Sequence, residues 1–338
     1  MKRFIPFITS LSISQRFHSK SPAANLAPVI WISNSLDPYL NLSIEEFLFR
    51  KVEIEKPILF LFRNRKSVII GRNQNPWQEA DLDKLDRQEI LLVRRRSGGG
   101  TVYHDEGNTN YSVMVPRLQF NRRKNAELVA SALTQMGVNA VNVTDRHDVC
   151  VEDFKVSGSA FRITNARAYH HGTMLINSDL AQLRGALRPS KKFDIVDSKA
   201  VGSVKSPVTS LSGTANASVN HEQFVKHVCK AFIQHYYPSI NYFPRPNAIG
   251  ESELVNNEFI QTGYQELKSW QWIFGQTPQF SSSIKLQIDQ VSIPVTVNYK
   301  NGMIEQVEYN LENMCANIKE KAKVAITKAF QIGDRIQT

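Results

Sequence analysis

Cysteine is scarce in this sequence. Its 338 residues contain three cysteines, Cys150, Cys229 and Cys315. They lie far apart, form no C-x-x-C pair and leave an odd count, which excludes a disulfide framework and a zinc site built on thiolate pairs. We therefore expect free thiols and a reducing compartment.

Long apolar runs are also missing. No stretch approaches the roughly 18 apolar residues that a membrane-spanning helix needs, so we expect no membrane span. Hydrophobic residues make up 42% of the chain and charged residues 21%, a balance that allows a buried core and argues against general disorder. The length suits two domains.

Acidic residues are absent before Asp37, whereas the same stretch contains Lys2, Arg3, Arg16 and Lys20 among several serines. This composition is typical of a mitochondrial transit peptide, although an ordinary basic tail would share it. We predict that residues 1–28 are a leader and that the protein acts in the mitochondrial matrix.

The net charge is +10. A basic balance suits nucleic acid, an anionic membrane surface, an acidic protein or a phosphate-bearing ligand, and it does not choose among them.

Local patterns predict a mixed α/β chain. Asp37 followed by Pro38 is typical of a helix start, and Asn220 with Gln223 indicates a second capped helix. A third helix is predicted from Asn125 to Met136. Alternating and apolar runs predict strands at 56–62, 67–71, 89–93, 109–115, 155–163 and 169–177. The first two are expected as a pair joined by the polar RNRK.

A change in composition marks the domain boundary. Residues 239–262 are polar and rich in Pro, Gly and Asn, which predicts a linker. Beyond it, three alternating runs (284–288, 292–299 and 303–309) precede a helical pattern that carries Leu311, Met314, Ile318, Ala322 and Ala325. We therefore expect a larger domain at 29–245 and a small α/β domain at 246–338.

The most unusual segment is RRRSGGGTVYHDEGN at residues 94–108. Glycines let a backbone approach a ligand closely, and exposed N–H groups beside fixed positive charge suit a phosphate or a carboxylate. No G-K-[ST] closes the segment and no G-x-G-x-x-G is present, so it is neither a P-loop nor a dinucleotide fingerprint. A plain turn beside a solvated basic face remains an alternative.

Two further segments hold chemistry-bearing side chains. HDVCVEDFKVSGSAFR (147–162) contains Lys155, and AYHHGTMLINSDL (168–180) contains His170 and His171. Adjacent histidines on a strand point to opposite faces, so they are poor partners for one metal ion, and one of them is expected to be packed or exposed. Lys155 could hold an anionic transition state as a compact charge, or it could be an ordinary exposed lysine.

Together these segments resemble the lipoate-protein ligase A and lipoyltransferase family. DPYLNLSIEEFLF (37–49), VIIGRNQNPWQEA (68–80), SKAVGSVKSPVTSL (198–211) and LKSWQWIFGQTPQF (267–280) occur in the same order as in that family. The resemblance implies an α/β (α+β) fold: a mixed-sheet catalytic domain like that of biotin protein ligase and class II synthetases, plus a small C-terminal α/β domain. It implies transfer of a lipoyl group to a lysine of lipoyl domains, in E2 subunits of 2-oxoacid dehydrogenases and in the glycine-cleavage H protein.

The resemblance also implies a site for lipoyl-AMP. Lys155 matches the lysine that contacts the carbonyl and phosphate oxygens. Phe62 stands where bacterial ligases often carry Trp and would pack on the dithiolane tail. The other implied binding residues are Arg95, Ser97, Gly98, Gly99, Gly100, Thr101, Tyr103, His104, Asn108, Asp148, Gly158, Ala160, His171, Gly172 and Thr173.

One departure bears on the acyl donor. The family usually has Asn-Asp ahead of the lysine, where this chain has His147-Asp148. A ring and an amide differ in donors and in protonation, so activation of free lipoate with ATP is in doubt, although Asp148 could hold magnesium. We therefore expect a monomeric lipoyltransferase that uses lipoyl-AMP or lipoylated H protein, with an ATP-dependent ligase as the alternative.

Two other hypotheses remain. Cys150 could carry a thioester as in related amidotransferases, but a small buried side chain is the expected role. A mitochondrial RNA-binding protein would suit the charge, yet no stacking aromatics stand beside the arginine run in a known RNA motif. We expect no nucleic acid partner.

Overall fold

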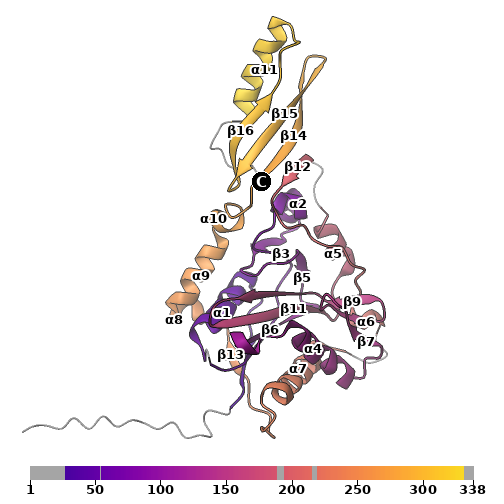
Figure 1. Cartoon of the computed structure of the whole chain (residues 1–338). Coiled ribbons are helices and arrows are strands. Elements are labelled where there is room, and N and C mark those ends of the chain that lie inside the picture. The colour runs from indigo at the N-terminus through magenta and orange to yellow at the C-terminus, as the bar shows by residue number, and fades with distance from the viewer. Residues whose placement is uncertain (1–26, 54, 189–193, 215–218, 331–338) are drawn as a thin grey trace, which may run out of the picture.

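The computed structural model describes residues 27–53, 55–188, 194–214 and 219–330 (Figure 1). The predicted leader lies almost wholly outside these residues. Within them, no helix is long and apolar enough to cross a bilayer.

A six-stranded mixed sheet forms the centre of the larger body. Its order is β10 (Ser159–Ile163), β11 (Arg167–Leu175), β6 (Asn108–Pro116), β2 (Ile58–Phe62), β1 (Val29–Ser33) and β13 (Asn247–Ile249). β1 runs parallel to both neighbours, and the other pairs are antiparallel. Every residue of β11 and β2 is buried, which is expected of strands covered on both faces.

Helices cover both faces of this sheet. α1 (Pro38–Lys51) and α9 (Glu258–Lys268) share one apolar cluster with β2, and α4 (Arg122–Gln135) and α7 (His221–Tyr236) share another with β6 (Figure 1). The Asp37 carboxylate caps α1, and α7 has the predicted capping box. α4 begins three residues before the expected Asn125, because Asn121 accepts the Lys124 N–H and caps it there.

Two small sheets flank the central one. They are β4 (Leu91–Arg94), β3 (Ser67–Ile70) and β5 (Val102–His104), and β7 (Val141–Val143), β8 (Val149–Val151) and β9 (Phe154–Ser157). The expected pairing of residues 56–62 with 67–71 is therefore wrong, because β2 and β3 belong to different sheets. The RNRK link is no exposed hairpin turn, since Asn64 within it is completely buried. Short helices complete the body: α2 (Pro76–Glu79), α3 (Leu82–Arg87), η2 (Arg117–Gln119), α5 (Leu180–Ala186), α6 (Leu211–Thr214), α8 (Glu253–Asn256) and α10 (Trp270–Ile273).

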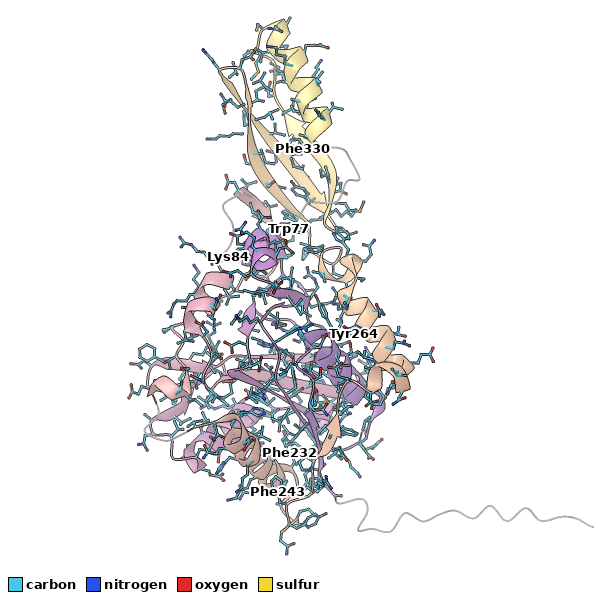
Figure 2. The ribbon with its side chains drawn as sticks, turned by 180° about the vertical axis from the view of Figure 1, so that it is seen from behind. Trp77, Lys84, Phe232, Phe243, Tyr264 and Phe330 are labelled. Atoms are coloured by element: carbon cyan, nitrogen blue, oxygen red, sulfur yellow. The ribbon has the colours of Figure 1, made fainter. Side chains whose placement is uncertain are left out.

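A small C-terminal unit projects from the body (Figure 1). It contains β14 (Phe280–Ile288), β15 (Val291–Lys300), β16 (Met303–Tyr309) and α11 (Ala316–Ala329). β12 (Asp194–Ser198) pairs with β14 and completes its sheet. Trp77 of the body lies at the junction and stacks on Phe280, with ring centroids 5.7 Å apart (Figure 2). The expected mixed α/β body with a small α/β unit is confirmed, although Leu311 and Met314 precede the last helix.

The boundary between the two parts differs from the expected 245/246. β13 pairs with β1 of the central sheet, α9 packs on α1, and Arg94 of β4 bonds the α10 backbone. Residues 247–273 therefore belong to the larger body, and the predicted linker at 239–262 contains β13, α8 and the start of α9. The small sheet also includes β12, although β12 lies within residues 29–245, which were expected to form the larger domain. Strand pairing decides both points, because it joins segments that are distant in the sequence.

Candidate active site

A cavity of about 670 Å³ opens between β5, the β9–β11 strands and the loops around residues 98–101, 145–148 and 201–204. Most of the predicted site residues line it: Phe62, Arg95, Gly98, Gly99, Gly100, Thr101, His104, Asp148, Lys155, Gly158, Ala160, His171, Gly172 and Thr173. Segments more than a hundred residues apart in the sequence, such as those that carry Phe62 and Thr173, thus contribute to one space, which is large enough for a cofactor-sized ligand.

Three predicted residues do not line the cavity. Tyr103 is buried in the core formed by the β3 and α3 side chains. Asn108 donates to Oδ1 of Asn110, which does line the cavity. Ser97 is completely buried and stands behind the wall, 2.8 Å from Nε2 of His171. Tyr103 points away from the cavity because its neighbours on β5, Val102 and His104, line it and side chains alternate along a strand.

The arginine run holds the backbone. Arg94 is completely buried, and its guanidinium donates to the carbonyl oxygens of Gly71, Arg72, Gln74, Trp272 and Ile273 and to the Thr277 hydroxyl, at 2.7 to 3.3 Å. Burial lowers the pKa of Arg94 to about 9. Arg96 lies 4.6 Å over the Trp272 ring and pairs with Glu266. The alternative of a solvated basic face is therefore wrong for this run.

Arg95 shapes the glycine loop, residues 98–100. It donates to the carbonyl oxygens of Gly98 and Gly100, the latter at 2.7 Å, and to Ile69 O at 3.0 Å. Gly99 has φ 83°, a conformation that a side chain would strain. Burial lowers the pKa of Arg95 to about 10, so its charge persists at neutral pH and fixes the loop beside the cavity.

Lys155 is a cation that lines the cavity. Its Nζ lies 2.9 Å from Oδ1 of Asp148, and 21% of its side chain is exposed. A Cβ on Gly158 would stand 2.9 Å from Cε of Lys155, so a side chain at this position would displace the end of the lysine. Backbone bonds to Pro207 O and from Thr209 N fix the strand that carries the lysine. The amine is held in place while it remains open to a ligand.

His171 belongs to a buried polar chain. Its Nδ1 lies 2.9 Å from Oε1 of Glu45 on α1, and its Nε2 lies 2.8 Å from Oγ of Ser97. Ser97 Oγ also accepts from Nε of Arg95 at 2.9 Å. The chain links α1, the glycine loop and β11, and it fixes the ring at the cavity wall. His170, on the opposite face of β11, is completely buried, and burial lowers its pKa to about 3, as expected of a packed neutral ring.

His147 lines the cavity beside Asp148. Its φ is 65°, a left-handed conformation that Asn, Asp and His adopt more readily than most residues. Burial, followed by Arg122 and Arg123, lowers the pKa of this ring. A neutral imidazole therefore stands where the family usually has an amide.

The apolar part of the cavity lining comes from Leu42, Phe62, Ile69 and Val102. Phe62 stacks on Phe60, with ring centroids 4.9 Å apart. This packing fixes the ring, so the surface suits an aliphatic or sulfur-containing chain.

Several lining residues were missed by the sequence analysis. Part of the cavity wall is formed by Val201, Gly202, Ser203 and Val204. They lie in the segment 198–211, whose resemblance to the family could have identified them. Ser203 Oγ accepts from the Thr101 N–H at 2.8 Å, which ties this loop to the glycine loop. Arg122, whose guanidinium lies 4.4 Å over Phe161, also lines the cavity, and no pattern in the sequence indicated it.

The part of the chain that the structure describes holds no metal site made by protein ligands alone. Among the described residues, no group of three or more His, Cys, Asp or Glu side chains could hold a metal ion. Asp148 is a single carboxylate and already pairs with Lys155. Any magnesium would therefore have to arrive with a nucleotide and rely on its phosphate oxygens.

Cys150 is buried on β8 and is absent from the cavity lining. Burial raises the pKa of its thiol, followed by the effect of Asp148. A buried thiol with a raised pKa is a poor nucleophile, so the geometry favours the packing role.

Comparisons with known proteins identify the family. The model of the lipoyl protein ligase A/B catalytic domain matches residues 37–233. A Schizosaccharomyces pombe protein that carries the lipoate-protein ligase A name is 36% identical over 325 residues, 90% of this chain and 86% of that protein. Lipoate-protein ligase A of Psychrobacter cryohalolentis is 34% identical over 273 residues, 80% and 79% of the two chains.

Solved structures share the fold. P. falciparum LipL1 in complex with lipoate is 29% identical with a TM-score of 0.65 and covers 84% of each chain. A lipoate protein ligase from T. acidophilum with bound lipoic acid is 23% identical with a TM-score of 0.58, over 73% of this chain and 99% of that one, which is a likeness of fold. From the matched domain and the two relatives above 30% identity, this chain belongs to the lipoyl protein ligase A/B family.

Proposed function

We propose that this protein joins a lipoyl group, through an amide bond, to the side chain of a specific lysine in lipoyl domains. The observation that carries the proposal is one cavity that combines an apolar wall, a fixed glycine loop and the Lys155 amine. Lipoyl-AMP has an apolar ring and chain, a reactive carbonyl and an anionic phosphate, and each of these finds a matching surface.

The residues divide the work by chemistry. Phe62, Leu42 and Ile69 cover the dithiolane ring and the aliphatic chain. The glycine loop allows close backbone contact with the acyl-phosphate group. Lys155 supplies positive charge to the carbonyl and phosphate oxygens, which become more negative as the transition state forms.

The transfer step is an acyl substitution. The neutral amine of the acceptor lysine attacks the lipoyl carbonyl carbon, and a C–N bond forms. The bond from that carbon to the phosphate oxygen breaks, AMP leaves with the electron pair, and the attacking nitrogen passes its proton to water. Lys155 lowers the barrier because it stabilises both the carbonyl oxyanion and the departing phosphate.

We further propose that the protein is a lipoyltransferase whose donor is lipoyl-AMP or lipoylated H protein. The support is His147, a neutral ring in the place of the usual amide. ATP-dependent ligation of free lipoate is the second candidate, favoured by the names of the two curated relatives.

The proposed acceptors are lipoyl domains of 2-oxoacid dehydrogenase E2 subunits and the H protein. The proposed location is the mitochondrial matrix, supported by the basic, acid-free leader. A net charge of +10 would favour encounter with acidic domains. Raised ionic strength should then slow transfer, and rates that ignore salt would remove this explanation.

A donor comparison tests the proposal. The full chain and an unlipoylated lipoyl domain are incubated with lipoyl-AMP, with lipoylated H protein, or with free lipoate plus ATP and magnesium, and acceptor mass is measured. Modification by either of the first two alone supports the transferase. Modification by the third supports the ligase, and no modification by any donor rejects lipoyl transfer.

A further inference from the structure

His104 has one ring nitrogen bound to the protein and one facing the cavity. Nδ1 lies 2.9 Å from Nδ2 of Asn64. In the part of the chain that the structure describes, no protein atom hydrogen-bonds Nε2, and this atom is not among the buried polar atoms without a partner. The ring lines the cavity, so Nε2 is the atom available to a ligand.

The orientation of the next amide is fixed by backbone carbonyls. Asn41, completely buried on α1, has its Nδ2 at 2.9 Å from Ser35 O, from Arg63 O and from Oδ1 of Asn64. Backbone carbonyls only accept hydrogen bonds, so this atom has to be the amide nitrogen. The hydroxyl of Ser33 donates to the remaining Oδ1 of Asn41, which agrees with that assignment.

The same argument determines which ring nitrogen of His104 carries the proton. Because Oδ1 of Asn64 accepts from Asn41, Nδ2 of Asn64 faces His104. An amide nitrogen only donates, so Nδ1 of His104 has to accept and cannot carry the proton. The proton of the neutral ring is therefore on Nε2. Burial, followed by Arg95 and His171, lowers the pKa of His104 to about 3, so the ring stays neutral at working pH.

We propose that Asn41 and Asn64 are positioning residues that hold His104 in its Nε2–H tautomer, so that the ring donates a hydrogen bond to an oxygen of the bound acyl-phosphate group. This inference rests on the proposed lipoyl transfer and goes beyond it. A fixed neutral donor adds direction to the charge of Lys155. The opposite tautomer would aim a lone pair at an electron-rich oxygen and weaken donor binding and transfer.

A purely structural role for the hydrogen bonds from Asn41 through Asn64 to His104 makes a different prediction. The amides would then only join α1 to the β2–β3 link, and the position of the ring proton would not affect transfer. Asn64→Asp separates the two, because a carboxylate can accept from both Asn41 and Nδ1 of His104. The variant keeps the shape of the side chain and moves the ring proton to Nδ1.

The first measurement uses the unmodified chain. Histidine-selective ¹⁵N NMR on the purified protein, with His104→Gln to assign its signals, should show a protonated Nε2 and an unprotonated Nδ1. Addition of lipoyl-AMP should shift the Nε2–H signal. A proton on Nδ1 would overturn the proposal, and so would an Nε2 signal that ignores saturating lipoyl-AMP. Neither readout depends on turnover.

The second measurement is the pH profile of Asn64→Asp with lipoyl-AMP as donor, expressed as the ratio of variant to wild-type rate. We expect a loss of about 100-fold at pH 8, the usual effect of one lost transition-state donor. The carboxylate raises the pKa of the ring, so the ratio should recover as pH falls and the imidazolium again carries Nε2–H. A flat ratio across pH would contradict the proposal.

Asn125→Asp is the matched control. Asn125 is also completely buried, but it lies on α4 and accepts from the Tyr236 hydroxyl outside the cavity. Its variant should show a flat ratio, which separates the loss of a specific proton from the general effect of burying a carboxylate. If the unmodified chain transfers no lipoyl group from any donor, the proposed function fails, while the NMR result still reports on the tautomer.

Discussion

The arginine run and Lys155 are both basic and both lie next to the cavity, yet they act differently. Arg94 and Arg95 are surrounded by carbonyl and hydroxyl oxygens of the protein itself. Lys155 has one carboxylate partner and a partly exposed side chain. The densest positive charge in the sequence therefore holds the fold together, whereas Lys155 remains open to a ligand.

The difference teaches that charge density in a sequence does not locate a binding charge. A cation that is already bonded by several internal acceptors has no free donors for a substrate, whereas a cation with few partners does. Arginine suits the first role because its planar fork of five donors can bond many carbonyls at once, and lysine suits the second as a compact charge.

The largest effect is expected from Arg94→Met. The change leaves buried carbonyl oxygens of the Gly71–Gln74 turn and of α10 without donors. Because unpaired buried groups are costly, we expect a loss of about 3–5 kcal/mol in the free energy of unfolding, measured by urea denaturation. Arg123→Met, in an exposed pair with Glu127, should change it by less than about 1 kcal/mol. Equal losses in the free energy of unfolding in the two variants would contradict the structural role assigned to Arg94.

Lys155→Met tests the other side of the comparison. Loss of the amine should lower the rate of lipoyl transfer by about 100- to 1,000-fold, with little change in thermal unfolding because the side chain is partly exposed. Rates are measured with lipoyl-AMP and an unlipoylated acceptor domain. Lys300→Met, on the exposed end of β15, is the control. Unchanged transfer in Lys155→Met would remove the assigned role.

Gly158→Ala asks how closely the lysine is placed. The added Cβ would stand 2.9 Å from Cε of Lys155, so the amine has to move. Since small misplacements of a reacting group are costly, we expect a loss of about 10- to 100-fold in transfer rate. Gly213→Ala in α6, where a Cβ meets nothing nearer than 3.7 Å, should retain activity. Full activity in Gly158→Ala would mean that the amine position is not critical.

The smallest effect is expected from Cys150→Ser. The thiol is buried away from the cavity lining, so transfer should stay within about twofold of the unmodified rate, as is usual away from chemistry. Acceptor modification is measured with the same donor. Capture of a lipoyl thioester on Cys150 would reverse this assignment and add a second nucleophile to the site.

Much of the candidate site could be predicted because its residues occur in short continuous segments. The glycine loop, the strand with Lys155 and the strand with His171 each carried a recognisable pattern, and the structure brings them to one cavity. Arg122 and Phe161 could not be found in this way, since their contact depends on α4 meeting β10. Tyr103 and Asn108 were included because they stand in a matching segment. Strand alternation places Tyr103 on the face of β5 away from the cavity, and Asn108 bonds Asn110 instead of lining the cavity itself.

The sequence by itself determined the features that depend on near neighbours. Asp37 and Asn220 start their helices because their side chains bond N–H groups only two or three residues away. The tertiary structure alone decided that β2 and β3 join different sheets, that residues 247–273 pack on the body, and that Arg94 is buried. The acceptors of Arg94 include Ile273, which is 179 residues away. A local pattern carries no record of such a partner, because burial and hydrogen bonding at that range exist only once the chain has folded.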